Sequence, residues 1–201
     1  MTLCVLMGIM PIHIKAWRRR KQYGVKGQFS QNPEEAASRW HEEMEEWKTQ
    51  AEEKWRLEWM HHNPYNWTRR LIGDPLVFHT RRRRMNYHVM QILIGHDIFN
   101  WYRHRISKQT YTSCWDCGAA LDDAKHVLFW CPRWALERVK LEAKLGTDFK
   151  LKSRVIEKIV DKERLWGEFY LFYTKTMKSR LNKERAMERT IREERRRTIR
   201  R

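Results

Sequence analysis

The chain has 201 residues, of which 42 are Lys or Arg and 25 are Asp or Glu, so its formal net charge is +17. This length holds one ordinary domain or two small ones. A balance this basic predicts a polyanionic partner, with nucleic acid favoured over an anionic membrane surface, and it says nothing about the fold.

Residues 1–31 indicate a connector that is first apolar and then basic. The apolar stretch over residues 3–14 has no basic residue in front of it, is too short to span a bilayer and contains Pro11. It is therefore interpreted as a buried segment and not as a signal peptide. A basic helix over residues 15–21 and a linker over residues 28–31 follow. The expected location is the cytoplasm or the nucleus, with no secretion and no membrane partner.

Residues 32–113 are predicted to form a helical region with basic patches. Asn32 suits an N-cap and Pro33 the first helical position, so a long helix starts there and continues to about Met60. Apolar side chains recur at helical spacing and predict a packing face opposite a solvated acidic face. The residues of this face are Trp40, Met44, Trp47, Ala51, Trp55 and Trp59.

Arginines gather in the second half of this region. Two of them follow Trp67, and two more are expected to point outward from a short helix around residues 99–106 that follows a helix ending at Gly95. Four consecutive arginines cannot all be buried, so residues 81–84 face either water or phosphate, and both alternatives stay open. The candidates for phosphate contact here are Arg69, Arg70, Arg81, Arg82, Arg83, Arg84, Arg103 and Arg105.

Residues 114–132 contain the most specific pattern of the chain, C-x2-C-x8-H-x4-C, formed by Cys114, Cys117, His126 and Cys131. Three thiolates and one imidazole are a known tetrahedral arrangement of structural zinc. The alternative of two disulfides needs the distant Cys4 and leaves the histidine without a role. The pattern therefore predicts a CCHC zinc knuckle whose metal is structural and closed.

Residues 133–182 are predicted to form C-terminal helices. The first carries Trp134 and Leu141 and stops at Gly146, a second starts near residue 151, and a third starts near residue 161. Residues 183–201 form a basic charged tail, which can be a solvent-facing helix but cannot build a core and is expected to fray. The predicted fold class is all-α, with helical bundle segments interrupted by the zinc knuckle.

Several blocks occur in an order that is similar to a known family. They are residues 3–12, 67–72, 91–99 and 102–106, followed by the cysteine pattern with the run over residues 126–134. In this order they resemble the C-terminal region of the Pol polyprotein of insect-type, LINE-like non-LTR retrotransposons. Ile94 stands where that family usually has Thr, and Arg103 where Leu is common; neither is a ligand.

The resemblance implies a region downstream of a reverse transcriptase core. The parent protein would be an RNA-directed DNA polymerase with an associated endonuclease, acting in the nucleus. The implied partners are the element RNA or target DNA and the polymerase core of the same polyprotein.

The chain itself shows no convincing catalytic set. Its one Asp-Asp pair, Asp122 and Asp123, lacks the neighbouring aromatic residue and the third acid that a polymerase needs. The predicted activity is therefore binding. Trp115 and Lys125 are candidates for contacts with unpaired bases. Trp130 either stacks on a base as well or packs under the zinc knuckle. Arg133 is a further candidate for phosphate contact. The alternatives are a zinc-stabilised helical protein-interaction module without a nucleic-acid role, and a nuclease contribution.

Overall fold

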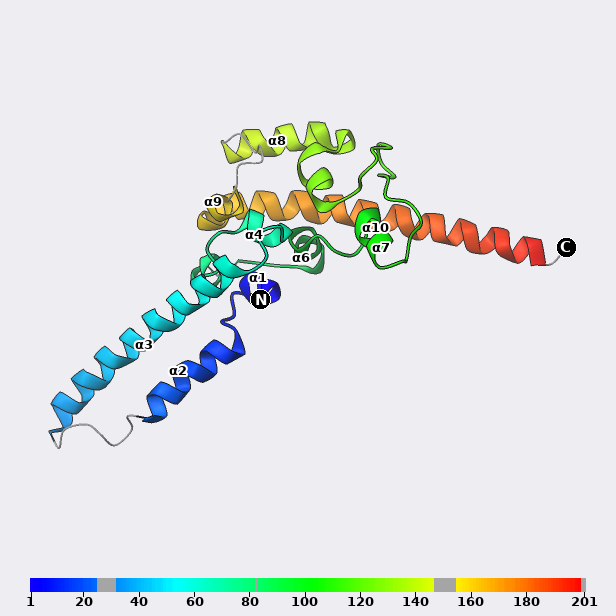
Figure 1. The fold of residues 1–201 in the computed structure, drawn as a ribbon. Coiled ribbons are helices and arrows are strands. Elements are labelled where there is room, and N and C mark those ends of the chain that lie inside the picture. The colour runs from blue at the N-terminus through cyan, green and yellow to red at the C-terminus, as the bar shows by residue number, and fades with distance from the viewer. Residues whose placement is uncertain (25–31, 82, 147–154, 200–201) are drawn as a thin grey trace. The chain divides into compact units, whose positions relative to one another are not determined.

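Helices account for all the regular secondary structure in the residues that the structure, a computed structural model, describes, which are 1–24, 32–81, 83–146 and 155–199 (Figure 1). This confirms the all-α prediction for those residues. The elements are α1 (Thr2–Leu6), α2 (Ile12–Gly24), α3 (Pro33–His61), α4 (Trp67–Leu71), α5 (Val77–Thr80), α6 (Tyr87–Ile94), α7 (Asn100–Arg105), the π-helical η1 (His126–Trp130), the 3-10 helix η2 (Pro132–Trp134), α8 (Ala135–Leu145), α9 (Val155–Asp161) and α10 (Glu163–Ile199).

The chain divides into two compact units, residues 1–82 and residues 83–201. Three features predicted from the sequence lie outside the described residues: the linker at 28–31, the start of a helix near 151, and Arg82. Within the described ranges, no helix is long and apolar enough to cross a bilayer.

The first unit contains the helix pair α2 and α3, which lie side by side. The side chain of Asn32 accepts a hydrogen bond from the backbone N–H of Glu34, so the N-cap forms as predicted. The packing face of α3 is confirmed from Trp47 onward, where Trp47, Ala51, Trp55 and Trp59 are buried, whereas Trp40 and Met44 are half-buried. The indole N–H of Trp59 donates to the Ile72 carbonyl at 3.0 Å, which ties α3 to the end of α4.

The apolar segment near the N-terminus is only partly buried. Val5, Leu6 and Ile14 are buried, whereas Leu3 and Ile12 are exposed. The prediction of a buried segment therefore holds for one side of it only, because the segment folds as two separate helices that each bury one side.

Helix α1 approaches α5 so closely that Gly8 is required between them. A Cβ at this position would lie 2.3 Å from the carbonyl oxygen of Phe78, and its φ of +61° is one that other residues avoid. The ring nitrogen Nδ1 of His79 lies 2.9 Å from the carbonyl oxygen of Gly8, and this contact holds α1 and α5 at the same short separation.

The second unit is built along α10, a helix of 37 residues (Figure 1). Helices α6, α8 and α9 pack against it. Its first half buries Leu165, Phe169, Tyr173 and Met177, which recur at helical spacing and form its packing face. The hydroxyl of Tyr173 donates to the Leu128 carbonyl at 2.6 Å, so α10 also holds η1 in place.

The C-terminal part of α10 is a solvent-facing helix, a form that the sequence allowed for the basic tail, while its fraying stays a prediction. The helix continues without a break to Ile199, and residues 185–199 are exposed. Buried contacts of Arg180 and Glu184 fix the helix just before this exposed part, and Arg192 and Glu188 form an ion pair one turn apart within it. The exposed part of the helix therefore follows directly after a turn that buried ion pairs hold in place.

Gly8→Ala is expected to destabilise the first unit by roughly 2–4 kcal/mol, because the new methyl group meets backbone and the left-handed conformation disfavours alanine. Urea unfolding and hydrogen exchange of the α1 and α5 amides measure the effect. Gly24→Ala is the matched control, because a Cβ there meets nothing within 4 Å; equal stability of the two variants would contradict the close approach.

Candidate metal centre

Four ligand atoms converge in the second unit, as the cysteine pattern predicted. The three sulfurs of Cys114, Cys117 and Cys131 and a ring nitrogen of His126 all lie within 4.8 Å of one another. None of the four cysteines of the chain is in a disulfide. A tetrahedral Zn²⁺ holds sulfur and nitrogen donors roughly 3.3–3.8 Å apart, so the cluster could hold a metal ion after a small contraction.

A tight turn presents the first two ligands. The N–H of Gly118 donates to the Cys114 carbonyl at 2.8 Å, and the N–H of Cys114 donates to the Ala119 carbonyl at 2.7 Å. Gly118 has a φ of +77°, which lets the chain fold back behind Cys117. Both thiols therefore point to one side of the turn from a closely hydrogen-bonded backbone.

A short helical segment presents the other two ligands. The carboxylate of Asp123 accepts a hydrogen bond from the His126 N–H at 2.7 Å, which starts η1. The N–H of Cys131 then donates to the His126 carbonyl at 2.7 Å. Arg138 of α8 donates to the Cys131 carbonyl at 2.6 Å, so the backbone behind the last ligand is also held.

The cluster is partly enclosed. Cys114 and Cys131 are buried against Trp134, with Phe172 of α10 packed beside them, while Cys117 and His126 are half-buried. The hydrogen bond between the two thiols lowers the pKa of Cys114 and raises the pKa of Cys131, and the nearby Arg180 guanidinium also lowers the pKa of Cys114. Cys114 is therefore the thiolate of this pair, and Cys131 must lose its proton when a metal binds.

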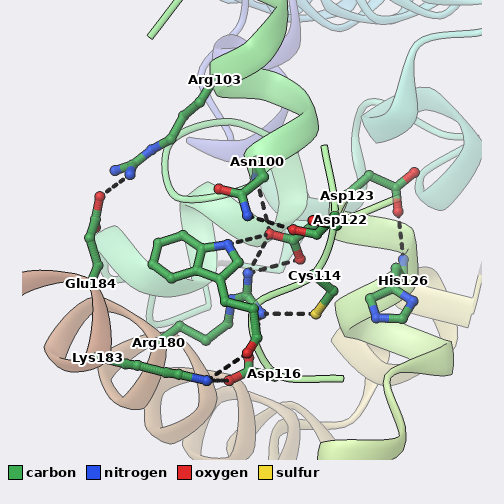
Figure 2. A network of polar contacts seen from close by, with 12 residues as sticks. Asn100, Arg103, Cys114, Asp116, Asp122, Asp123, His126, Arg180, Lys183 and Glu184 are labelled. Atoms are coloured by element: carbon green, nitrogen blue, oxygen red, sulfur yellow. Dashed lines mark hydrogen bonds and ion pairs between the residues drawn. The ribbon is translucent and has the colours of Figure 1, made fainter. Parts of the chain in front are cut away.

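Arg180 of α10 connects the metal loop, defined as residues 114–131, to the rest of the unit (Figure 2). Its guanidinium donates to Asp116 at 2.6 Å and to both oxygens of Asp122 at 2.6 and 2.8 Å. The side chain is 2% exposed and lies 3.8 Å from the sulfur of Cys114. The Arg180 guanidinium thus neutralises the carboxylates of Asp116 and Asp122 and also reaches the sulfur of Cys114.

Asp122 accepts hydrogen bonds from several elements of the second unit. Besides Arg180, it accepts the N–H of Asn100 at the start of α7 and the indole N–H of Trp115. Burial raises the pKa of Asp122 to about 6, although Arg180 lowers it. Asp123, its neighbour, caps η1. Both aspartates of the pair that was rejected as a polymerase motif therefore have structural partners.

Arg103 was expected to point outward from α7, and this is not what the structure shows. Its guanidinium forms an ion pair with Glu184, which is buried, and its Nε donates to the Asp97 carbonyl at 2.9 Å. Lys183 beside Glu184 donates to the Trp115 carbonyl and to Asp116. These contacts join α7 and the metal loop to the same turn of α10 (Figure 2).

Sequence reasoning missed these partners of the metal loop. Arg180 and Glu184 continue the apolar stripe of α10, because they lie seven residues after Tyr173 and Met177. A charged residue in register with a packing face is the signal that could have identified them. Instead, Glu184 and Lys183 were included in the solvated tail.

The other arginines predicted to contact phosphate fall into two groups. Arg69 donates to the His62 carbonyl at the end of α3, and Arg83 donates to the carbonyls of Val160 and Asp161 at the end of α9, so both are engaged within the fold. The exposed group is Arg70, Arg81, Arg84, Arg105 and Arg133. For these, phosphate contact stays a prediction.

The residues predicted to meet bases differ in accessibility. Trp115 is half-buried and lies within the Arg180 network, with the guanidinium 5.6 Å from its ring centroid. Lys125 is also half-buried. Trp130, for which packing and stacking were both open, is 58% exposed next to the last ligand. Trp130 therefore offers the more accessible ring.

Comparison with protein-family models, curated proteins and solved structures finds no match. The site is therefore interpreted from its own residues. Its four ligands are protein side chains in a loop that backbone hydrogen bonds, Arg138 and Arg180 hold together. This favours a structural role for a bound ion.

Purified protein is expected to contain about one divalent metal ion per chain, and Cys117→Ser is expected to lose it, because three ligands hold the ion more weakly than four. Elemental analysis after gel filtration measures the stoichiometry. Cys4→Ser is the matched control and retains the metal, since Cys4 lies outside the cluster. Metal-free wild type would contradict the site.

Arg180→Met is expected to destabilise the second unit by about 3–5 kcal/mol, because it leaves the buried Asp122 carboxylate without its cation. Adding Asp122→Asn is expected to recover part of this loss, as measured by chemical unfolding of the metal-loaded protein. Arg189→Met on the exposed part of α10 is the control, with a change within about 0.5 kcal/mol. Similar values for Arg180 and Arg189 would show that the network contributes little.

Proposed function

We propose that the protein is a nucleic-acid-binding module in which zinc holds the Cys3His loop. The observation that carries this proposal is the arginine stripe, defined as Arg185, Arg189, Arg192 and Arg196 on the exposed part of α10. Their spacings of four, three and four residues place them on one face of the helix. The overall charge of +17 gives the chain a long-range attraction for polyanions.

The stripe fits the backbone of a nucleic acid better than a scattered set of charges would. Residues three or four apart on a helix lie roughly 5–6 Å apart, which is close to the spacing of phosphates along one strand. Because the helix is continuous through Ile199, these cations are presented along a fixed axis. Arg192 is paired with Glu188 at 4.0 Å but remains 76% exposed at its side chain, so this pair leaves it accessible.

The metal loop would add contacts with unpaired bases. Zinc would fix the loop, and Trp130 would offer its exposed ring beside Cys131. Arg133 lies two residues further along and is also exposed. The loop thus combines a stacking surface with a cation, which is a common arrangement in proteins that bind single strands.

The resemblance to the C-terminal region of non-LTR retrotransposon Pol proteins supports the same function. On this proposal the module holds element RNA or target DNA for a reverse transcriptase core that precedes it in the parent protein, and it acts in the nucleus. The genomic sequence upstream of the Met1 codon tests the parentage: a polymerase palm in the same frame would support it, and an unrelated reading frame would count against it.

A protein-interaction module is the second candidate, and one surface favours it. Helices α8 and α10 form a groove of about 350 Å³ that includes Leu171 and Phe172. Leu171 is 64% exposed, and Leu136 and Val139 on α8 are exposed as well. Apolar side chains exposed in this way are typical of protein contacts.

Replacement of the four stripe arginines by Gln is expected to weaken binding to a labelled single-stranded oligonucleotide. The slope of log K against log salt should fall by about 3, at roughly 0.7 per lost phosphate contact. Fluorescence anisotropy between low and high salt measures both. Gln preserves helix propensity, so the comparison isolates charge.

The matched control replaces four exposed lysines elsewhere in the second unit by Gln, namely Lys140, Lys158, Lys162 and Lys175. It removes the same charge and should retain most of the salt slope. If both variants lost affinity and salt slope equally, the binding would depend on net charge and not on the position of the stripe. Absence of oligonucleotide binding by the zinc-loaded wild type would favour the protein-interaction module.

A further inference from the structure

A cavity of about 670 Å³ lies between α6, α7 and α10 in the second unit, and none of the four metal ligands lines it. Its volume falls in the range of small-molecule sites. The walls come from α6, the turn after Gly95, and α7 with the residues that follow it, and α10 contributes Glu188. The polar lining distinguishes it from a gap in the hydrophobic core.

One wall of the cavity is a stacked pair of rings. His96 and Tyr102 have ring centroids 4.3 Å apart and planes inclined by 19°. His96 is exposed, and the Arg105 guanidinium lies 5.4 Å from the Tyr102 ring centroid. Burial, and then the charge of Arg105, lower the pKa of His96. A neutral imidazole stacked on tyrosine is therefore available for contact with another flat ring.

A hydrogen-bonding edge lies beside these rings. The hydroxyl of Tyr87 donates to Oδ2 of Asp97 at 2.6 Å, and Arg103 donates to the Asp97 carbonyl. The hydrogen bond to Asp97 raises the pKa of Tyr87 to about 12, so the phenol keeps the proton that it donates. Asp97 has a φ of +75°, and these two contacts hold its carboxylate at the cavity.

We propose that this cavity binds an unpaired guanine base, which stacks on the outer face of His96 while its edge is recognised by Asp97. Guanine carries two adjacent donors, the N1–H and the 2-amino group, which match the two acceptor oxygens of a carboxylate. Gln91, which also lines the cavity, offers an amide N–H for the O6 acceptor. Uracil offers one such donor on this edge.

The charges around the cavity orient the nucleotide. Lys108 lies at the rim and is exposed, so it can meet the phosphate. Glu188 lies on the α10 side, where its carboxylate disfavours phosphate. The base is therefore expected next to Asp97, with its sugar and phosphate toward Lys108. This proposal rests on the proposed nucleic-acid function for its source of guanine.

The test compares ten-nucleotide RNAs that differ only at one central position in a run of uridines. Zinc-loaded full-length protein should bind the RNA with one guanosine about tenfold more tightly than the all-uridine RNA. Inosine, which lacks the 2-amino group, should lose most of this gain, and adenosine should lose all of it. Anisotropy at constant salt measures the affinities.

Asp97→Asn is the decisive variant, because Asn accepts the left-handed backbone conformation but replaces one acceptor oxygen by a donor. It should abolish the preference for guanosine, measured as the ratio of the affinities for the guanosine RNA and the all-uridine RNA. His96→Ala should weaken guanosine binding through lost stacking. Asp161→Asn, on the exposed end of α9, is the matched control, and metal content with circular dichroism verifies that each variant is folded.

The outcomes separate this proposal from the proposed function. Equal affinity for all four RNAs, unchanged by Asp97→Asn, overturns the guanine site and leaves nucleic-acid binding in place. In a second experiment, calorimetry measures the binding of free guanosine monophosphate. If RNA does not bind but the free nucleotide does, with loss in Asp97→Asn, the cavity is a nucleotide site and the proposed function fails. Binding of neither ligand overturns both.

Discussion

The second unit depends on the ion pairs that Arg180 makes with Asp116 and Asp122. All three side chains are at most 8% exposed, and the guanidinium reaches both carboxylates at 2.6 Å. Desolvating such groups is costly unless each keeps its partner, so the arrangement tolerates little displacement. The N-terminus of α7, the turn that carries Cys114 and the middle of α10 must therefore stay together, whether or not a metal adds its own bonds.

The features that the sequence predicted well are those encoded locally. The four ligands lie within 18 residues of one another and form one cluster, and the tryptophan face of α3 follows from spacing along one helix. Arg180 and Asp122 are 58 residues apart, and no local pattern indicates that they meet. Exposure of Trp130 and enclosure of Trp115 likewise depend on where α10 passes, which periodicity does not specify.

Net charge was a poor guide to the roles of individual arginines. Arg69 and Arg83 satisfy carbonyls at helix ends, and Arg103 pairs with Glu184. The exposed arginine stripe lies on the helix that also contributes Glu188 to the cavity beside His96. A strand whose phosphates follow the stripe would therefore pass near the proposed base site, and it would have to leave α10 at Glu188 to place its phosphate toward Lys108.

The separation of Arg180 from the metal loop has a consequence for how the protein is made. During translation the last cysteine leaves the ribosome well before α10, so the growing chain presents all four ligands without the cation that neutralises Asp122. Coordination of an ion by the nascent loop would organise the segment during that interval, since metal binding and folding are coupled in short segments. When α10 emerged, it would then meet a preformed acidic surface, and the cell's supply of free metal would affect how efficiently newly synthesised copies mature.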